Sequence, residues 1–186
     1  VAGIISLNIF FLIYFLLYSN ILYDYIFICN LIFFIGFLDD IKIKVSPSKR
    51  LLLMIFSIFF FIYFMFIEIF NFEISFLKNF LKIYFFSSIF VLLCFLFIIN
   101  GANLIDGFNG LLTINFVIIN SILLYINILN GNNEFSVLLI AQLIIFLSFL
   151  LFNFPIAKIF LGDSGSYLIG SLIALNSIIT NNLNPD

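Results

Sequence analysis

Long apolar runs divide this sequence, and their length is close to that needed to cross a lipid bilayer. Hydrophobic residues make up 65% of the 186 residues, and charged residues make up only 9%. A soluble domain cannot bury so much apolar surface, because its exterior would also have to be apolar. Runs of about 20 apolar residues fit spanning α-helices, and unbroken runs exclude the alternating strands of a membrane barrel. We therefore expect an all-α, polytopic helical membrane protein.

Polar segments divide the chain into about seven predicted transmembrane helices. Their approximate bounds are 1–18, 25–38, 51–70, 83–99, 111–129, 135–152 and 167–180. We expect residues 1–186 to form a single integral membrane catalytic domain. Because the chain begins with Val1 rather than Met and stops directly after a polar turn, we also expect it to be truncated at both ends.

The distribution of cations predicts how the helices are oriented. Four of the seven Lys and Arg residues lie in the segment 39–50, and cytoplasmic loops carry an excess of such residues. Two predicted helices separate this loop from the polar stretch 100–112, and two more separate that stretch from the segment 153–166. We therefore expect all three loops to lie at the cytoplasmic face, with their aspartates close together.

The aspartates of these loops form a predicted acidic cluster. Its members are Asp39, Asp40, Asp106 and Asp163. Cations lie beside them in the sequence, and Mg2+ is usually shared between one or two carboxylates and substrate phosphates. This combination predicts a metal that holds a membrane-bound phosphate, and therefore phosphoryl transfer. Asp39 and Asp40 would point about 100° apart on a helix, so we expect them to have different roles.

Other polar and small residues receive simpler interpretations. The acids expected at the outer face, and therefore not expected to be catalytic, are Asp24, Glu68, Glu73 and Glu134. Glycines beside the acids let the backbone approach a ligand closely, whereas Gly36 and Gly170 are interpreted as helix-packing residues. Cys29 and Cys94 lie in apolar segments without paired spacing, so we interpret them as packing residues.

Three motifs, in this order and between the expected number of helices, resemble the polyprenyl-phosphate N-acetylhexosamine-1-phosphate transferases of the MraY/WecA type (glycosyltransferase family 4). They are Phe37-Leu-Asp39-Asp40 followed by Ser46-Pro47, Asn100-Gly-Ala-Asn103-Leu-Ile-Asp106-Gly-Phe-Asn109-Gly-Leu, and Lys158-Ile-Phe-Leu-Gly-Asp163-Ser-Gly-Ser. Each motif alone is weak, but their order and spacing make the resemblance specific. It covers essentially the whole chain.

The resemblance implies a Mg2+-dependent enzyme of cell-wall or surface-polysaccharide synthesis. Such an enzyme transfers a sugar-1-phosphate from a UDP-N-acetylhexosamine to polyprenyl (undecaprenyl) phosphate and releases UMP. It implies a multi-pass protein of the bacterial plasma membrane with a cytoplasmic active site. The expected partners are these two substrates and the lipid bilayer, with no nucleic acid, and a homodimer is left open.

The resemblance also implies roles for individual residues. The catalytic residues would be Asp39, Asp40 and Asp106, and Asp163 would be the metal ligand. The nucleotide would be bound by Asn103, Gly107, Asn109, Asn153 and Phe160. The phosphates would be bound by Lys42, Lys44, Lys49, Arg50 and Lys158.

Two departures from the family pattern affect this interpretation. Asn109 stands where many members carry a second Asp, which favours a UDP-N-acetylglucosamine-type enzyme slightly over the peptidoglycan-precursor enzyme. The chain also contains no His, whereas the family carries a His-containing loop nearer its C-terminus. We expect that loop to lie in sequence beyond this chain.

Three alternative functions can be weighed against the transferase. A membrane secondary transporter is the main one, because intramembrane acids and amides can bind ions, but the acids here cluster toward one face. An intramembrane aspartyl protease would need glycine where Phe160 stands. A CDP-alcohol phosphotransferase would need Ala-Arg where Asn109-Gly110 stands.

Overall fold

The computed structural model describes residues 23–43, 45–65, 80 and 83–184. Within these ranges the chain forms six helices. They are α2 (Tyr23–Asp40), α3 (Pro47–Met65), α5 (Tyr84–Ile105), α6 (Leu111–Leu129), α7 (Asn133–Asn153) and α8 (Gly162–Leu183). The all-α prediction is confirmed for the described residues, and these helices correspond to six of the predicted segments. The predicted helix over residues 1–18 lies outside the described residues, so the total of seven is not confirmed.

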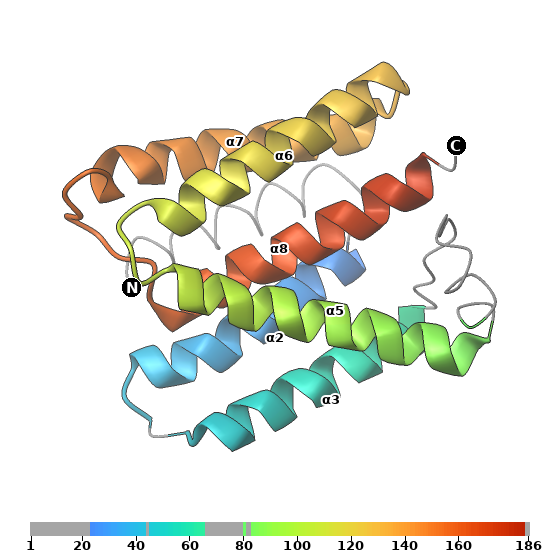
Figure 1. Ribbon diagram of the computed structural model, residues 1–186, viewed down its shortest axis with the longest axis horizontal. Helices are drawn as coiled ribbons and strands as arrows, with labels where there is room; N and C mark the ends of the chain where they lie inside the picture. Colours follow the sequence, from blue (N-terminus) through green and yellow to red (C-terminus); the bar gives the residue numbers. More distant parts are fainter. Residues whose placement is uncertain (1–22, 44, 66–79, 81–82, 185–186) are drawn as a thin grey trace.

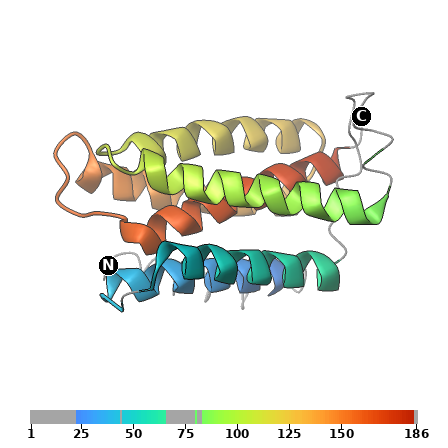
Figure 2. The ribbon, with the colours of Figure 1, turned by 60° about the horizontal axis from the view of Figure 1, so that its bottom comes forward.

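The six helices are arranged in three layers of two. Figure 2 shows α6 and α7 in one outer layer, α5 and α8 in the middle, and α2 and α3 in the other outer layer. Helix α8 packs against α2, α5 and α6, and it lies at the centre of the bundle (Figure 1). Helix α3 contacts α2 and α5, whereas α7 packs mainly on α6.

The central position of α8 explains its unusual composition. It is rich in Ser and Asn, yet most of its residues from Ser164 to Asn176 are buried. A helix enclosed by other helices contacts protein rather than lipid, so its polar side chains can pair across helix interfaces. By contrast, α5, α6 and α7 are each long and apolar enough to span a membrane. Large apolar side chains such as Phe97 and Leu151 are exposed on them, as expected of a lipid-facing surface.

Two glycines let the central helix approach its neighbours closely. A Cβ atom added at Gly36 of α2 would lie 2.5 Å from the carbonyl oxygen of Asp163, and one at Gly170 would lie 2.7 Å from the Cα of Ile99 on α5. No larger side chain fits at these distances without movement of a backbone. The packing interpretation of Gly36 and Gly170 is therefore confirmed.

A network of uncharged side chains joins four helices inside the bundle. The Tyr25 hydroxyl donates to Asn176 Oδ1 (2.7 Å) and accepts from Gln142 Nε2 (2.8 Å). Asn176 Nδ2 donates to Asn120 Oδ1 and to Gln142 Oε1, and Asn120 Nδ2 donates to the same Gln142 oxygen. The three amide side chains have no solvent exposure. This group of four residues, called the amide network below, ties α2, α6, α7 and α8 together.

Candidate active site

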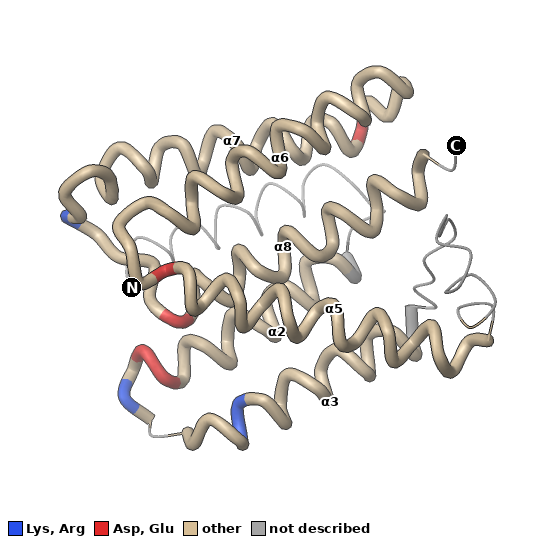
Figure 3. Tube along the Cα trace, viewed as in Figure 1, with Lys and Arg blue, Asp and Glu red and all other residues tan. Residues whose placement is uncertain are grey.

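The three aspartate-bearing loops meet at one end of the bundle. Helix α2 ends at Asp40, α5 ends at Ile105, and α8 begins at Gly162. Figure 3 shows acidic residues of all three segments gathered at this end. The prediction that the three segments lie at the same end of the bundle is therefore confirmed. Successive antiparallel helices return alternate loops to the same side.

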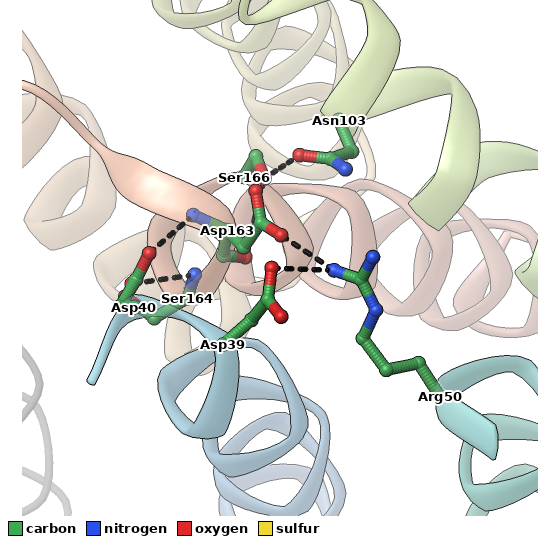
Figure 4. Close-up of polar contacts among 7 residues, drawn as sticks. All are labelled: Asp39, Asp40, Arg50, Asn103, Asp163, Ser164 and Ser166. Atoms are coloured by element: carbon green, nitrogen blue, oxygen red, sulfur yellow. Dashed lines mark hydrogen bonds and ion pairs between the residues drawn. The ribbon is translucent and has the colours of Figure 1, made fainter. Parts of the chain in front are cut away.

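Arg50 joins two of these loops. Its Nη1 atom lies 2.9 Å from Asp39 Oδ2 and 2.7 Å from Asp163 Oδ2, so one guanidinium nitrogen donates to both carboxylates (Figure 4). The arginine comes from the first turn of α3, just after Pro47, whose fixed φ suits the start of a helix. Its side chain is 18% exposed, against 33% for Asp39 and 29% for Asp163. The predicted approach of Asp39 to Asp163 is confirmed.

Asp40 faces a different direction from Asp39. Its Oδ1 accepts a hydrogen bond from the backbone N–H of Asp163 (3.0 Å), and its Oδ2 accepts from the N–H of Ser164 (3.1 Å). The Ser164 hydroxyl donates to the same Oδ2 atom. The two neighbouring aspartates therefore have separate partners, as their expected angular separation on a helix predicts.

Helix α5 is linked to α8 near the same end. Asn103 Oδ1 accepts a hydrogen bond from the Ser166 hydroxyl (2.7 Å), and that hydroxyl also contacts the carbonyl oxygen of Asp163 (3.2 Å). Asn103, one of the predicted nucleotide-binding residues, thus lies beside the first turn of α8, which carries Asp163 (Figure 4). Its nucleotide-binding role stays a prediction.

Asp106 follows the last turn of α5 and is half-buried. Burial raises the pKa of this carboxyl to about 7, and the charges of Asp163 and Asp40 contribute to the rise. Burial also raises the pKa of Asp163, which precedes the predicted spanning segment, and Asp39 acts in the same direction while Arg50 opposes it. Asp106 therefore lies near enough to Asp163 and Asp40 for their charges to act on its carboxyl.

The donor set of this cluster fits a cation that is shared with a ligand. Two of its four carboxylates, those of Asp39 and Asp163, pair with the one guanidinium of Arg50, so the cluster holds more acidic groups than basic ones. Within the described ranges, no three carboxylate or thiol side chains converge on a point that a metal ion could occupy. Mg2+ needs only one or two carboxylates when phosphate oxygens and water complete its shell. The cluster therefore fits a metal bound together with phosphates and does not form a closed protein site.

A second group of predicted residues lies where α6 begins and α7 ends. Asn153 is buried, and its side chain accepts from the Gly110 N–H (2.6 Å) and donates to the Ile159 carbonyl oxygen (2.7 Å). It therefore holds the start of α6 and the loop before α8. Asn109 is exposed and contacts the Pro155 carbonyl oxygen at 3.4 Å. Gly107 is also exposed.

Phe160 is an exposed member of the predicted nucleotide-binding set. It is 65% exposed and lies two residues before α8 begins, in the loop that leads to Asp163. An exposed aromatic ring next to a polar site costs free energy in water unless a partner covers it. Its position is compatible with the predicted contact to a base, which stays a prediction.

The basic residues divide into two groups. Arg50 lies inside the cluster, whereas Lys42, Lys49 and Lys158 are exposed around it. Lys44 lies outside the described residues. Among the acids expected at the other face, Glu134 is in the first turn of α7, at the end opposite Asn153. Glu68, Glu73 and the side chain of Asp24 lie outside the described part of the chain.

Two serines that organise the site were not predicted from the sequence. Ser164 and Ser166 pair with Asp40 and Asn103, but were noted only as members of a motif. Their position beside Asp163 in a Gly-Asp-Ser-Gly-Ser sequence was the available signal. The three-residue spacing of Asn100, Asn103, Asp106 and Asn109 would place them along one stripe of a helix, but α5 ends at Ile105, so the stripe does not continue beyond it.

Comparison with known proteins is consistent with this geometry. A family model described as Glycosyl transferase family 4 matches residues 21–181. The phospho-N-acetylmuramoyl-pentapeptide-transferase of Streptococcus uberis is 35% identical over 161 residues, which cover 78% of this chain and 45% of that protein. The protein of the same name from Streptococcus agalactiae is 33% identical over 160 residues, covering 77% and 45%. A Staphylococcus carnosus relative is 37% identical over 82 residues. The chain thus spans less than half the length of these relatives.

Proposed function

Because the chain belongs to glycosyl transferase family 4, we propose that the protein transfers a sugar-1-phosphate from a UDP-sugar to polyprenyl phosphate and releases UMP. The observation that carries this proposal is the meeting of Asp39, Asp163 and Arg50 at one end of a membrane helix bundle. A phosphorylated lipid has its charged group at the end of such a bundle, where a soluble nucleotide sugar can also reach it.

The reaction needs the protein to position the reactants and neutralise their charge more than it needs covalent catalysis. An oxygen of the lipid phosphate attacks the phosphorus that bears the sugar, the bond from this phosphorus to the bridging oxygen breaks, and UMP leaves with that oxygen. Both reactants are anionic, so positioning and neutralisation of charge are the main contributions in phosphoryl transfer. Arg50 can donate to a phosphate in place of a carboxylate, since a guanidinium binds both groups through the same fork of N–H donors.

Mg2+ is the cofactor that we propose for this reaction. Asp163 would hold it, with Asp106 beside Asp163, and hard carboxylate oxygens are the protein ligands that this ion prefers. When bound, the metal supplies positive charge that neutralises the phosphate oxygens. Asp39 faces the same space as Asp163, and it would orient the attacking lipid phosphate or accept its proton.

The proposed donor is a UDP-N-acetylhexosamine. The names of the relatives favour the muramoyl-pentapeptide form, whereas Asn109 gave a slight preference for the N-acetylglucosamine form. The relatives carry more weight, because an Asp-to-Asn difference at one exposed position changes charge without removing hydrogen-bonding capacity. Phe160 would stack on the uracil. We also propose that the protein lies in the bacterial plasma membrane and that its active site faces the cytoplasm.

The test is a transfer assay with the full chain in lipid vesicles. The donors would be radiolabelled UDP-N-acetylmuramoyl-pentapeptide and UDP-N-acetylglucosamine, with undecaprenyl phosphate as acceptor. We expect label in the lipid fraction and an equal amount of UMP, both requiring Mg2+ and both lost when EDTA is added. Uptake of a solute into the vesicles without any lipid-linked product would contradict the proposal and would support the secondary transporter.

A further inference from the structure

Both carboxylate oxygens of Asp40 are engaged by the backbone of another helix. Oδ1 accepts from the N–H of Asp163, and Oδ2 accepts from the N–H and the hydroxyl of Ser164. These donors belong to the first turn of α8, more than 120 residues away in the sequence. By contrast, the carboxylate of the adjacent Asp39 pairs with the side chain of Arg50 (Figure 4).

Helix α8 has no local side chain that caps its start. Leu161 occupies the N-cap position, and it makes no side-chain hydrogen bond there. The first N–H groups of a helix lack intrahelical partners, and an oxygen acceptor at this position stabilises the helix. A carboxylate also complements the positive end of the helix dipole. Asp40 therefore supplies from α2 the cap that α8 does not provide for itself.

Two glycines make this contact between helices possible. A Cβ atom at Gly162 would lie 2.7 Å from Asp40 Oδ1 and 2.8 Å from Oδ2, and the φ of Gly162 is +70°. One turn before Asp40 on α2, Gly36 lets the backbone of Asp163 lie against that helix. The carboxylate could not reach the amides if either position carried a larger side chain.

We propose that Asp40 is a positioning residue, which caps α8 and thereby aims Asp163 at Asp39 and Arg50. The capping contact stands on geometry alone, whereas its effect on turnover rests on the proposed function. The proposal divides the aspartate pair: Asp39 faces the reacting groups, and Asp40 orients the carboxylate that would hold the metal. It replaces the expectation that Asp40 acts directly in catalysis.

The experiment compares Asp40→Ala with Asp40→Asn in the full chain. Amide hydrogen exchange would be followed by mass spectrometry on peptides covering residues 161–168, and turnover would be measured by the transfer assay. Asn retains an oxygen acceptor and is itself a common N-cap, whereas Ala has no acceptor. We expect Asp40→Ala to speed exchange in this segment roughly 5- to 30-fold. Asp40→Asn should speed it less, and turnover should fall in the same order.

Asp39→Ala is the matched control on the neighbouring residue. It should reduce turnover without freeing the amides of Asp163 and Ser164. Gly162→Ala tests the same contact from the other side, because its new Cβ displaces the Asp40 carboxylate. The effects of Gly162→Ala and Asp40→Ala on exchange should therefore be less than additive in the double variant, since both remove one interaction.

Two results would overturn the proposal. One is wild-type exchange over residues 161–168 in Asp40→Ala. The other is complete loss of turnover in Asp40→Asn with wild-type exchange, which would show that Asp40 acts on the substrate itself. If Asp40→Ala does not fold, Asp40→Asn and Gly162→Ala give the same exchange comparison. Faster exchange in a protein that forms no lipid-linked product would uphold the cap and contradict the proposed function.

Discussion

The acidic cluster and the amide network are both polar groups in an apolar helix bundle, but they are built in opposite ways. In the amide network, Asn120, Gln142 and Asn176 have no solvent exposure, and their oxygens and nitrogens pair with one another and with Tyr25. In the acidic cluster, Asp39 and Asp163 keep about a third of their side-chain surface exposed. One group is closed and neutral, and the other is open and carries excess negative charge.

The difference indicates which region supports structure and which can bind a ligand. An uncharged polar group deep in a bundle is costly unless every donor and acceptor is paired, so such a network contributes to helix placement. Charges at the end of a bundle remain hydrated and can exchange partners. The two regions share α2 and α8: α2 carries Tyr25 and the aspartate pair, and α8 carries Asn176 and Asp163.

The largest expected effect is that of Asp163→Asn on turnover. An amide is a poorer metal ligand of similar size, and it also weakens the ion pair with Arg50. We expect kcat to fall roughly 100- to 1,000-fold, with little change in the free energy of unfolding. Glu134→Gln is the matched control, because it makes the same kind of change in the first turn of α7, away from the acidic cluster. It should keep wild-type turnover. Comparable Mg2+-dependent rates in Asp163→Asn and wild type would show that the metal binds elsewhere.

Asn176→Ala should have the converse effect, on stability rather than chemistry. It leaves the Tyr25 hydroxyl without its acceptor and the Asn120 oxygen without its donor. We expect the free energy of unfolding in detergent to fall by about 1–2 kcal/mol, while kcat of the folded fraction stays near wild type. Asn115→Ala is the control, because the hydrogen bond of Asn115 goes to the carbonyl of Leu111 in its own helix. Equal losses in both variants would mean that the network contributes no specific stability.

The pH dependence of cation binding should distinguish the two regions further. The pKa of Asp106 is about 7, so its carboxyl is neutral below that pH and charged above it. Folding raises this pKa from 3.8. The contribution of Asp106 to the free energy of unfolding is therefore fully present below pH 3.8 and is lost as the pH rises through about 7. The charge gained on that rise favours a cation.

Mn2+ affinity, measured by electron paramagnetic resonance, should therefore increase by up to about tenfold per pH unit below pH 7 and level off above it. Asp106→Asn should flatten this slope, whereas Asn176→Ala should preserve it. An unchanged slope in Asp106→Asn would assign the titration to another group of the acidic cluster.

The smallest predicted effect is that of Phe160→Ala. The side chain is 65% exposed, so its truncation should not change the free energy of unfolding. Loss of stacking on a base should raise KM for the UDP-sugar about 3- to 10-fold with kcat unchanged, since stacking acts in the ground and transition states alike. Phe152→Ala removes another exposed ring, from α7, and should leave KM unaltered. A fall in kcat alone would contradict the stacking role.

Part of this arrangement could be predicted from sequence because it depends only on helix order. Spanning helices alternate in direction, so loops separated by two helices return to one side. This rule brought Asp39, Asp106 and Asp163 to the same end without any knowledge of packing. The angular separation of adjacent residues on a helix likewise predicted different roles for Asp39 and Asp40, which is consistent with their different partners.

The partners themselves depended on how the helices rotate and pack. Nothing local in the sequence distinguishes Asn176, which joins the amide network, from Asn115, which bonds its own helix. The nucleotide-binding role of Asn153 stays a prediction, and the contacts of its buried amide with Gly110 and Ile159 were not predicted from the sequence. Hydrogen bonds between helices require a particular rotation and depth of each helix, and these follow from the packing of all its faces at once.

The sequence by itself determined that the chain is a helical membrane protein with Asp39, Asp106 and Asp163 at one end, because hydrophobic run length and helix count are properties of the chain alone. Only the tertiary structure decided that α8 lies at the centre, that Arg50 bridges Asp39 and Asp163, and that Asp40 caps α8. Each of these contacts joins segments remote in the sequence, and the close approach at Gly36 and Gly162 that permits the cap exists only once the helices have packed.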